Sequence, residues 1–542
     1  MLIEVLANMV YGAILAHPYP NGYATWNQTF ATDHHVKVMG GFNWETKHYK
    51  DVKAVGYYLM SETLNDLDLA GSGEDGNKRM EVTGGQNEYA LSGFFGRINY
   101  DYKAKYMISA NYRRDGLSSL GSKNKWGNFW GVSAAWRISE EKWFQPIRDA
   151  LTELKLKASY GVVGNSQIGF YSAQSYYSSD VAYGGKAASI LANIGDSNLA
   201  WESSAKLDVG LEFSLYNIVS VGLDYYNTTS KNLVMAVPQG PSTGIGSLIT
   251  NTGSMRNQGI ELTISADVIK KRNFNWYTSF NFTTVENKVL SLADGVTEIY
   301  GSSESNITLP GYSMGQLYLY PTGGIDPATG RRVFFGTNGE RTTYDPLTGD
   351  WYLDDGTSFQ GSLAQVRAGN TIPTWFGGWS NTFTFYGVDI NLLFQFSGGN
   401  WIFNGNSATG SDMRWWNNFK EVETNCWQKP GDNAKYAKPY YGDNVSNGSA
   451  YDITDWVEKG DYLRLKNISA GYTFKFKNAR VHGISSLRLY AQVQNAFVIT
   501  AYTGLDPEVT SSYTNDAIMS SGYDKNTLPQ ARTYTFGVQL KF

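Results

Sequence analysis

Hydrophobic and polar residues alternate one by one along many segments of the chain, each about 10 to 14 residues long. Between residues 206 and 215, apolar side chains occupy every second position from Leu207 to Leu215, and polar or small side chains lie between them. The same alternation recurs in 219–226, 260–268, 388–396 and 487–494. Because successive side chains of a β-strand point to opposite faces, each segment predicts a strand with one apolar and one polar face.

We predict about fifteen such strands. Most are longer than the roughly 5 to 6 residues typical of soluble strands. Their polar faces carry charges in mid-strand and aromatic residues gather near their ends, which is typical of strands that cross an outer membrane around a hydrated lumen. The expected strands lie near 33–47, 51–62, 88–101, 105–115, 126–138, 152–162, 203–215, 218–230, 257–269, 273–286, 375–386, 388–398, 459–476, 485–499 and 531–542.

Short and long connections alternate between these strands. Short turns are expected at 102–105, 216–217, 270–273 and 386–387, with slightly longer ones at 48–50, 139–151 and 477–485. The long connections are 113–126, 163–202, 231–256, 287–374, 399–459 and 500–530. Short periplasmic turns and long extracellular loops are typical of transmembrane barrels. The predicted fold is therefore all-β, an antiparallel transmembrane β-barrel with long extracellular loops.

The alternation also predicts which face of each strand meets lipid, since a charged side chain in hydrocarbon costs free energy. Residues 462–476 break the pattern, because the apolar parity changes near Lys466; either a β-bulge or an exit from the lipid band explains this. We expect Leu207, Val209, Leu211, Ile260, Leu262, Ile264, Leu487 and Leu489 to face lipid, and Lys206, Asp208, Glu261 and Arg488 to face the lumen.

Composition supports a strand-rich membrane protein and excludes several other classes. The 542 residues include 38 Tyr, 26 Phe, 16 Trp and 58 Gly, and only 17% are charged. We find no run of about 18 apolar residues, which argues against a helical membrane bundle. The net charge of −4 shows no nucleic-acid footprint. A single cysteine, Cys426, excludes an internal disulfide framework and a cysteine-based zinc site.

The two ends of the chain suggest a part of a larger barrel. An odd strand count does not suit a single-chain bacterial barrel, and the first residues lack the basic start of a secretory signal. We therefore expect residues 1–542 to be the C-terminal part of a barrel that does not close when expressed alone. The last strand resembles the signal that the outer-membrane assembly machinery recognises, through Thr535, Gly537, Leu540 and Phe542.

Several stretches resemble motifs of the SusC/RagA family of TonB-dependent outer-membrane transporters from Bacteroidota. Residues 96–100 and 113–116 resemble the family segment GRxNY…RRDGSS, although Leu117 interrupts its serine run. Residues 154–165 resemble LKLRASYGxxGN, and residues 251–261 resemble NxGxMxNxGxE. Further matches lie at 461–469, 494–497, 500–508 and 528–534, so that the resemblance covers about residues 31–542.

The resemblance implies a barrel of roughly 22 strands, closed by an N-terminal plug and energised through a TonB box. It also implies a SusD-like surface lipoprotein that captures the ligand, and import of a glycan or a peptide without covalent chemistry or a cofactor. We find no plug domain, TonB box or signal peptide in the sequence. The alternatives are a passive porin-like barrel, a soluble carbohydrate-binding β-protein such as a propeller and, with less support, an outer-membrane enzyme, for which no nucleophile–base set is present.

Three motifs could carry other chemistry, but each has a simpler interpretation. Gly71–Gly76 fits GxGxxG, yet it follows no parallel strand and contains acidic residues, so a surface loop is favoured. Of His34, His35 and His48 only the first two adjoin, and neighbours on a strand face opposite ways, so no metal site is favoured. Two Asp-Pro-x-Thr-Gly units, 326–330 and 345–349, favour hairpin turns over a calcium site.

An aromatic loop is the best candidate for ligand contact. Exposed tryptophan rings can stack on sugar rings or peptide side chains, and neighbouring charged groups can form hydrogen bonds with them. Packing within the loop, or contact with the lipoprotein, is the alternative interpretation. The candidate residues are Asp412, Arg414, Trp415, Trp416 and Trp427.

Overall fold

Antiparallel β-strands dominate the computed structural model of the chain, which describes residues 8–16, 21–56, 80–165, 168–301, 305–414, 417–476, 484–508, 521–525 and 527–542. The predicted all-β class is confirmed. In this described part, none of the helices has the length and apolar character that crossing a membrane requires. The chain divides into a first compact unit, Met1–Trp136, Ala158–Lys206 and Ser230–Thr252, and a second, Arg137–Lys157, Leu207–Thr229 and Gly253–Phe542.

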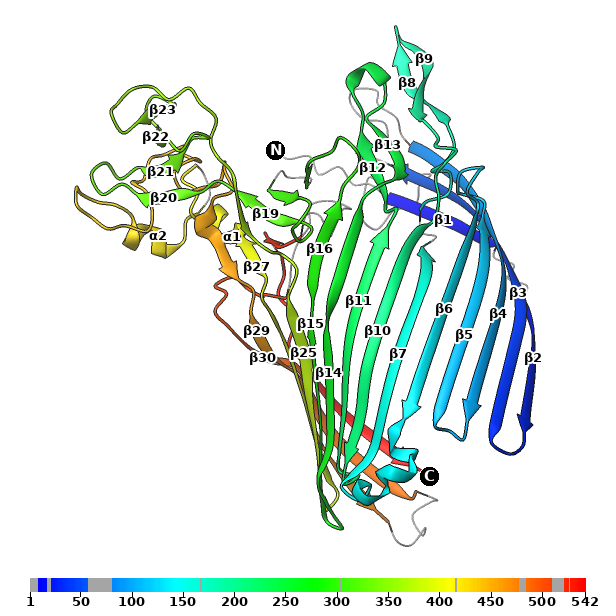
Figure 1. Ribbon diagram of the computed structural model, residues 1–542. Coiled ribbons are helices and arrows are strands. Elements are labelled where there is room, and N and C mark those ends of the chain that lie inside the picture. The colour runs from blue at the N-terminus through cyan, green and yellow to red at the C-terminus, as the bar shows by residue number, and fades with distance from the viewer. Residues whose placement is uncertain are drawn as a thin grey trace. The chain divides into compact units, whose positions relative to one another are not determined.

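Long strands paired edge to edge form the sheet of the first unit (Figure 1). β3 pairs with β1, β2 and β4, β4 pairs with β5, and β5 pairs with β6, always antiparallel. Three-residue turns connect β2 to β3 and β4 to β5. The strands are β1 (Asn8–Ala16), β2 (Asn21–Phe30), β3 (His34–Gly56), β4 (Met80–Tyr102), β5 (Tyr106–Leu117) and β6 (Trp126–Arg137).

The start of this sheet differs from the prediction. A turn was expected at residues 48–50, but β3 continues through them and pairs with β4 along all of its 23 residues. The turn lies instead at residues 31–33, where Ala31 and Thr32 have φ values of 45° and 63°. Two successive positive φ values match the twist of a hairpin, but Ala and Thr are not the residues that normally announce one. The two predicted strands 33–47 and 51–62 therefore belong to one strand, β3, as far as Gly56, and β2 was not predicted. Residues 57–62 lie outside the described residues.

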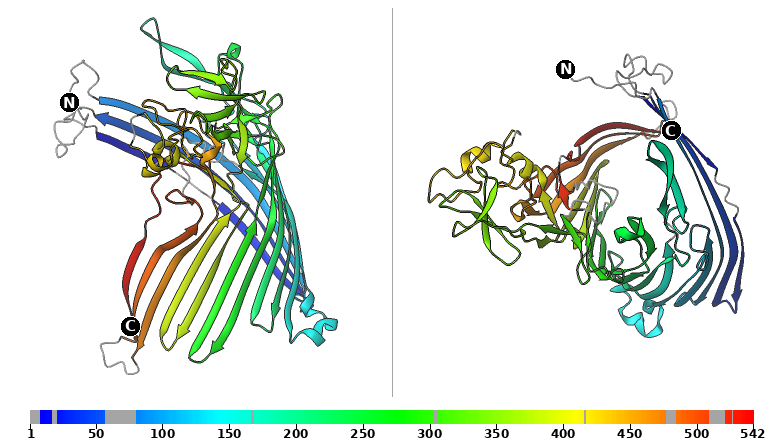
Figure 2. Two further views of the ribbon diagram at one scale, coloured as in Figure 1. Left: turned by 90° about the vertical axis from the view of Figure 1, so that its left-hand side faces the viewer. Right: turned by 90° about the horizontal axis from the view of Figure 1, so that it is seen from above.

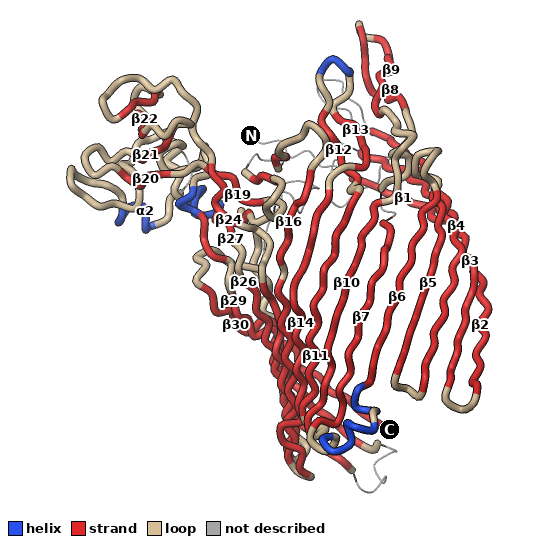
Figure 3. The backbone as a smooth tube through the Cα atoms, in the orientation of Figure 1, coloured by secondary structure: helices blue, strands red, loops and turns tan. Residues whose placement is uncertain are grey.

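The loop segments that connect the strands of the first unit pack on a small core. Two hairpins rise there, β8 with β9 and β12 with β13 (Figure 3). Their bounds are β8 (Tyr176–Tyr183), β9 (Lys186–Asn193), β12 (Val234–Pro238) and β13 (Ser247–Asn251), with a 3₁₀ turn at Pro241–Thr243. The core consists of Leu117, Leu120, Ile168, Leu199 and Trp201, with Val234 and Ile249 packed against it.

A further set of long antiparallel strands belongs to the second unit. β14 pairs with β15 and β16, and the order then continues β15, β25, β26, β29, β30 and β32 through antiparallel neighbours (Figure 2). The bounds are β14 (Ser254–Lys271), β15 (Phe274–Thr284), β16 (Glu286–Ser291), β25 (Trp375–Phe385), β26 (Val388–Gly398), β29 (Tyr462–Lys475), β30 (Ser486–Thr500) and β32 (Thr533–Lys541). The chain runs through both units in β7 (Leu151–Asn165), β10 (Glu202–Leu215) and β11 (Val219–Lys231), and 3₁₀ turns at Ile138–Glu140 and Lys142–Ile147 precede β7.

Turns between the strands of the second unit agree with the sequence pattern. Tight turns occur at 216–218, 272–273 and 386–387, where turns were predicted at 216–217, 270–273 and 386–387. The register between β29 and β30 shifts between Leu465 and Asn467, so the change of parity near Lys466 is a β-bulge. The predicted turn at 477–485 lies largely outside the described residues.

Charged and apolar side chains alternate on these strands as predicted. On β10, Glu212 bonds to Lys155 and Lys157, and Lys157 continues to Asp224 on β11 at 2.9 Å. Apolar residues of the opposite parity are exposed, among them Leu207, Ile260 and Leu489 at 38%, 48% and 44%. That this apolar face meets lipid stays a prediction.

The long connections of the second unit fold into a separate loop region with its own core. Leu317, Phe334, Phe403, Ile453 and Trp456 are among the buried side chains of that core. Its elements are β17 (Ile299–Tyr300), β18 (Asn306–Thr308), β19 (Gln316–Leu319), β20 (Thr322–Ile325), β21 (Arg332–Phe335), β22 (Arg341–Asp345), β23 (Asp350–Leu353), β24 (Val366–Gly369), β27 (Trp401–Asn404), α1 (Gly405–Gly410), α2 (Lys420–Asn425), β28 (Val457–Lys459) and β31 (Tyr523–Asp524), with a 3₁₀ turn at Thr454–Trp456.

Candidate functional site

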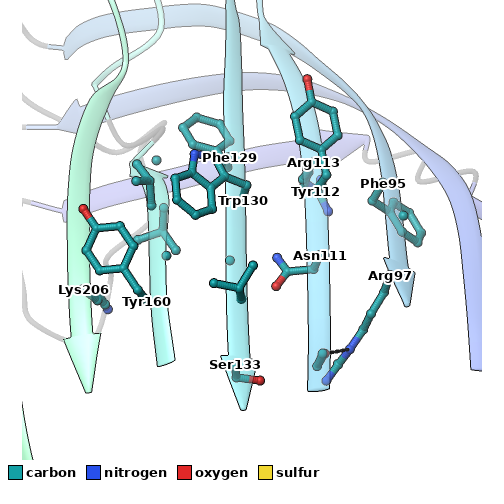
Figure 4. Close-up of a pocket in the computed structure, with 18 of the residues that line it drawn as sticks. Phe95, Arg97, Asn111, Tyr112, Arg113, Phe129, Trp130, Ser133, Tyr160 and Lys206 are labelled. Atoms are coloured by element: carbon teal, nitrogen blue, oxygen red, sulfur yellow. Dashed lines mark hydrogen bonds between the residues drawn. The ribbon is translucent and has the colours of Figure 1, made fainter. Parts of the chain in front are cut away.

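A cavity of about 780 Å³ lies on one face of the first unit's sheet, lined by residues of β3 to β7 and by Trp201 and Lys206. We call it the wall cavity (Figure 4). Strand register builds its lining, because Arg97 pairs with Asn111 and Asn111 pairs with Gly131. Two residues further along the strands, Phe95 pairs with Arg113 and Arg113 pairs with Phe129. Charged, amide and aromatic side chains therefore line one continuous surface.

An ion pair closes the cavity at the loop end of β5. The Arg113 Nε donates to an oxygen of Asp115 at 2.5 Å, and its Nη2 donates to Asn43 at 2.8 Å. Gly93 lies beneath this group, and a Cβ there would overlap the Asp115 carboxylate. Asp115 is only 7% exposed, and its second oxygen accepts no hydrogen bond from the described residues.

Aromatic rings rest on glycines at the same level of the sheet. A Cβ on Gly127 or Gly164 would overlap the ring of Phe129, and a Cβ on Gly41 would lie 2.7 Å from the ring of Phe95. Trp201 meets Phe129 edge-on at 5.3 Å between ring centroids. These glycines let the rings lie close to the backbone and leave the cavity open.

Arg97 and Lys206 give the wall cavity a positive character. The Arg97 Nε is held by Asn99 and Ser109 at 3.0 and 3.3 Å, which orients the guanidinium. Lys206 is exposed at the rim. Such a lining can hold polar or anionic solutes through hydrogen bonds. It brings together no nucleophile and general base.

The cavity was not predicted as a site from the sequence. Arg97, Arg113 and Asp115 contributed only to the family resemblance. The signal that could have found it is the polar parity of 97, 99, 109, 111, 113 and 115 on neighbouring strands. Only the register shows that these positions are adjacent.

The predicted aromatic loop has a tightly packed interior. Asp412 is buried and accepts from the Arg414 Nε at 2.8 Å and from Ser449 Oγ at 2.5 Å. Trp427 is 6% exposed and its indole N–H donates to the Pro327 carbonyl at 2.8 Å. Both side chains therefore serve the packing of the loop, and the expected exposed ring is not found at Trp427. Trp415 and Trp416 lie outside the described residues, so their contact with a ligand stays a prediction.

Three residues of the predicted assembly signal, Thr535, Gly537 and Leu540, lie on β32, which pairs with β30, and Phe542 directly follows this strand. Leu540 is opposite Leu487, and Gly537 is opposite Tyr490, whose ring covers it so closely that a Cβ would overlap the ring. Thr535 is opposite Gln492 on β30. The side chain of Phe542 is 79% exposed. The role of Thr535, Gly537, Leu540 and Phe542 in assembly stays a prediction.

The two Asp-Pro-x-Thr-Gly units form turns. The Asp326 carboxylate accepts from the Ala328 N–H and Thr329 hydroxyl, and Asp345 accepts from the Leu347 N–H and from Arg331. Over the described ranges, no three His, Cys, Asp or Glu side chains gather in a group able to hold a metal ion. His34 bonds to Tyr100, and Gly71–Gly76 lies outside the described residues.

Comparisons with known proteins agree with this geometry. The family described as "TonB dependent receptor-like, beta-barrel" matches residues 8–496. TonB-dependent receptor P3 of Formosa agariphila is 30% identical, over 96% of this chain and 52% of its own length. TonB-dependent receptor SusC of Bacteroides thetaiotaomicron is 24% identical, over 93% and 51%. The solved RagAB peptide transporter is 23% identical with a TM-score of 0.83, over 99% of this chain and 57% of that one. The chain thus spans about half the length of the curated relatives it matches.

Proposed function

The chain belongs to the TonB-dependent receptor-like β-barrels, of the SusC/RagA type expected from its motifs, and we propose that it forms the barrel part of an active nutrient importer. It is a protein of the bacterial outer membrane. The importer takes up glycans or peptides, depends on TonB for energy and works with a SusD-like lipoprotein. The barrel assembly machinery inserts it, and no covalent chemistry accompanies transport.

The observation that carries the proposal is the wall cavity. Hydrogen-bonding groups such as Arg97 and Asn111 and the ring of Phe129 line one surface of the sheet. A few directed polar groups among aromatic rings are the usual composition of a site for a small solute. The aromatic loop supports the proposal in a second way, since Asp412 and Trp427 hold its shape while other residues of the loop contact the ligand.

Uptake in the native bacterium tests the proposal. We expect cells that lack the gene to lose saturable uptake of a labelled oligosaccharide or peptide, and the restored gene to return it. An uncoupler of the proton gradient should abolish this uptake, because a TonB-energised importer needs that gradient. A passive porin-like barrel would continue uptake in the presence of the uncoupler, and this outcome would reject active import.

An Asn111→Ala variant connects the test to the wall cavity. It removes a hydrogen-bonding amide without changing the charge, and we expect weaker uptake at normal surface abundance. Asn217→Ala, in the turn between β10 and β11, is the control and should leave uptake unchanged. Equal uptake by the Asn111→Ala and Asn217→Ala variants would show that transport does not depend on the wall cavity.

A further inference from the structure

A second cavity of about 600 Å³ lies among the loops of the first unit. Its lining comes from β4, from the segment before β8 and from the β8–β9 and β12–β13 hairpins, and we call it the loop cavity. Asn87, Phe170, Gln174, Tyr176 and Asn193 contribute the side chains that matter for recognition. Its volume is within the roughly 300 to 1,000 Å³ of small-molecule sites, enough for a short run of sugar rings.

Contacts of the lining residues with one another and with β4 hold the walls of the loop cavity in place. Tyr176 and Asn193 are cross-strand partners at the base of the β8–β9 hairpin. The Asn193 Nδ2 donates to the Gln174 carbonyl at 2.6 Å, and Tyr171 OH accepts from the Glu88 N–H at 3.1 Å. Phe170 packs against Tyr89 with 5.8 Å between ring centroids. The cavity is therefore formed before a ligand arrives.

The chemistry of the lining is uncharged. None of the described residues that line the loop cavity is Asp, Glu, Lys, Arg or His, in contrast to the wall cavity with Arg97, Arg113 and Lys206. Three side-chain amides and three aromatic rings remain. The side chains of Asn87 and Gln174 each carry two N–H donors and a carbonyl acceptor, while the buried Asn193 amide serves the wall through its bond to the Gln174 carbonyl. Neighbouring sugar hydroxyls, which both donate and accept, match this pattern.

Aromatic rings complete the match to sugars. The C–H face of a pyranose is apolar and packs flat on an aromatic ring, and Tyr176 offers such a ring with 51% of its surface exposed. A peptide with charged termini or side chains, or an acidic glycan, would find no charge partner among these residues. We propose that the loop cavity is a subsite for neutral glycan segments. This inference rests on the proposed import function and names its substrate class.

The strand geometry supplies a matched pair of variants. Tyr176 lines the cavity, whereas Tyr177, its neighbour on β8, does not line it and is 71% exposed. Tyr176→Ala removes the stacking ring, and Tyr176→Phe keeps it. Gln174→Ala removes one amide. Tyr177→Ala removes the same kind of side chain from the same strand and controls for damage to the hairpin.

Binding to the purified full protein in detergent tests the proposal. The probes are maltohexaose, laminarihexaose, xylohexaose and mannohexaose, with hexagalacturonate and a charged hexapeptide for comparison, and affinity is measured by calorimetry. We expect at least one neutral probe to bind. Tyr176→Ala should weaken that binding by about tenfold, the size expected for losing one aromatic contact. Gln174→Ala should also weaken it, and Tyr176→Phe and Tyr177→Ala should not.

Three results would overturn the proposal. They are no binding of any neutral probe, preferred binding of hexagalacturonate or the peptide, and equal loss in Tyr176→Ala and Tyr177→Ala. The outcome is separate from the uptake test. Energised uptake of peptides alone would leave the import function standing and reject the glycan subsite. Binding of neutral glycans together with uptake that an uncoupler does not reduce would leave the glycan subsite standing and reject active import.

Discussion

Arg488 on β30 reaches across β29 to Asp389 on β26, with its Nε and Nη2 at 2.9 and 2.5 Å from the two carboxylate oxygens. Gly471 of β29 lies beneath the guanidinium, opposite Asp389. Lys157 reaches Asp224 over Gly210 in the same way. A glycine in the middle strand thus allows a cation to join strands that are not neighbours. Both bridges lie in the second unit, where they join strands across its polar face.

Gly471→Ala should therefore destabilise the protein. A Cβ there would lie 2.8 to 2.9 Å from the guanidinium of Arg488, which would have to leave Asp389. We expect a loss of about 1 to 3 kcal/mol, typical of an overpacked site. Thermal unfolding of the purified protein measures it. Gly222→Ala on β11 is the control, because nothing lies within 4 Å of its Cβ position. Equal melting temperatures for both variants would show that the bridge does not need Gly471.

The sequence predicted the long strands well because alternation reports directly on strand faces. It misplaced the first turn because Ala31 and Thr32 adopt positive φ without the glycine or asparagine that marks such turns. The turn expected at 48–50 is absent, since β3 continues through these residues and pairs with β4. The loop region was beyond prediction for another reason. Its core joins Phe334, Phe403 and Ile453 from distant segments, and no local pattern reports on such contacts.

Arg332 should be the most sensitive charged residue of the loop region. It is buried, and its guanidinium bonds to Asp455 and to the carbonyls of Ser446 and Lys435. Arg332→Met would leave these partners without their donor, which costs about 3 to 5 kcal/mol for a buried pair. We expect fast proteolysis of residues 320–460 while the strands stay protected.

Arg341→Met is the matched control for that experiment. Arg341 pairs with Asp354, but both side chains are more than half exposed, so its loss should cost no more than about 1 kcal/mol. If the two variants are cleaved at the same rate, burial of Arg332 does not stabilise the loop region.

Asp412 should make the aromatic loop sensitive to strong acid. Burial alone would raise the pKa of Asp412, but hydrogen bonds from Arg414 and Ser449 outweigh it and hold that pKa below its usual range. A depressed folded-state pKa stabilises the loop above the unfolded pKa of about 4. The stabilisation is lost as pH falls through the lower folded value.

Hydrogen exchange of residues 399–459 between pH 7 and pH 3 checks this prediction. We expect protection to persist at pH 4 and to fall below it. Asp412→Asn should reduce protection at pH 7 and flatten the acid response. Glu421→Gln, which removes an exposed carboxylate bonded to Lys435, should leave the profile of the wild type. If the loss of protection in acid persists in Asp412→Asn, other carboxylates cause it.

Gly537 on β32 and Phe542 directly after it should separate packing from recognition during assembly. Gly537→Ala would push the Tyr490 ring away, so we expect it to lower the melting temperature of the purified protein. Phe542 is 79% exposed and contributes little burial. Phe542→Ala should therefore leave the melting temperature unchanged, because unburied apolar area adds little to folding free energy. The same variant should reduce outer-membrane abundance if the assembly machinery recognises this ring. Lys541→Ala controls for the position. Normal abundance of Phe542→Ala would remove Phe542 from the assembly signal, and a lowered melting temperature would mean that the ring acts through packing.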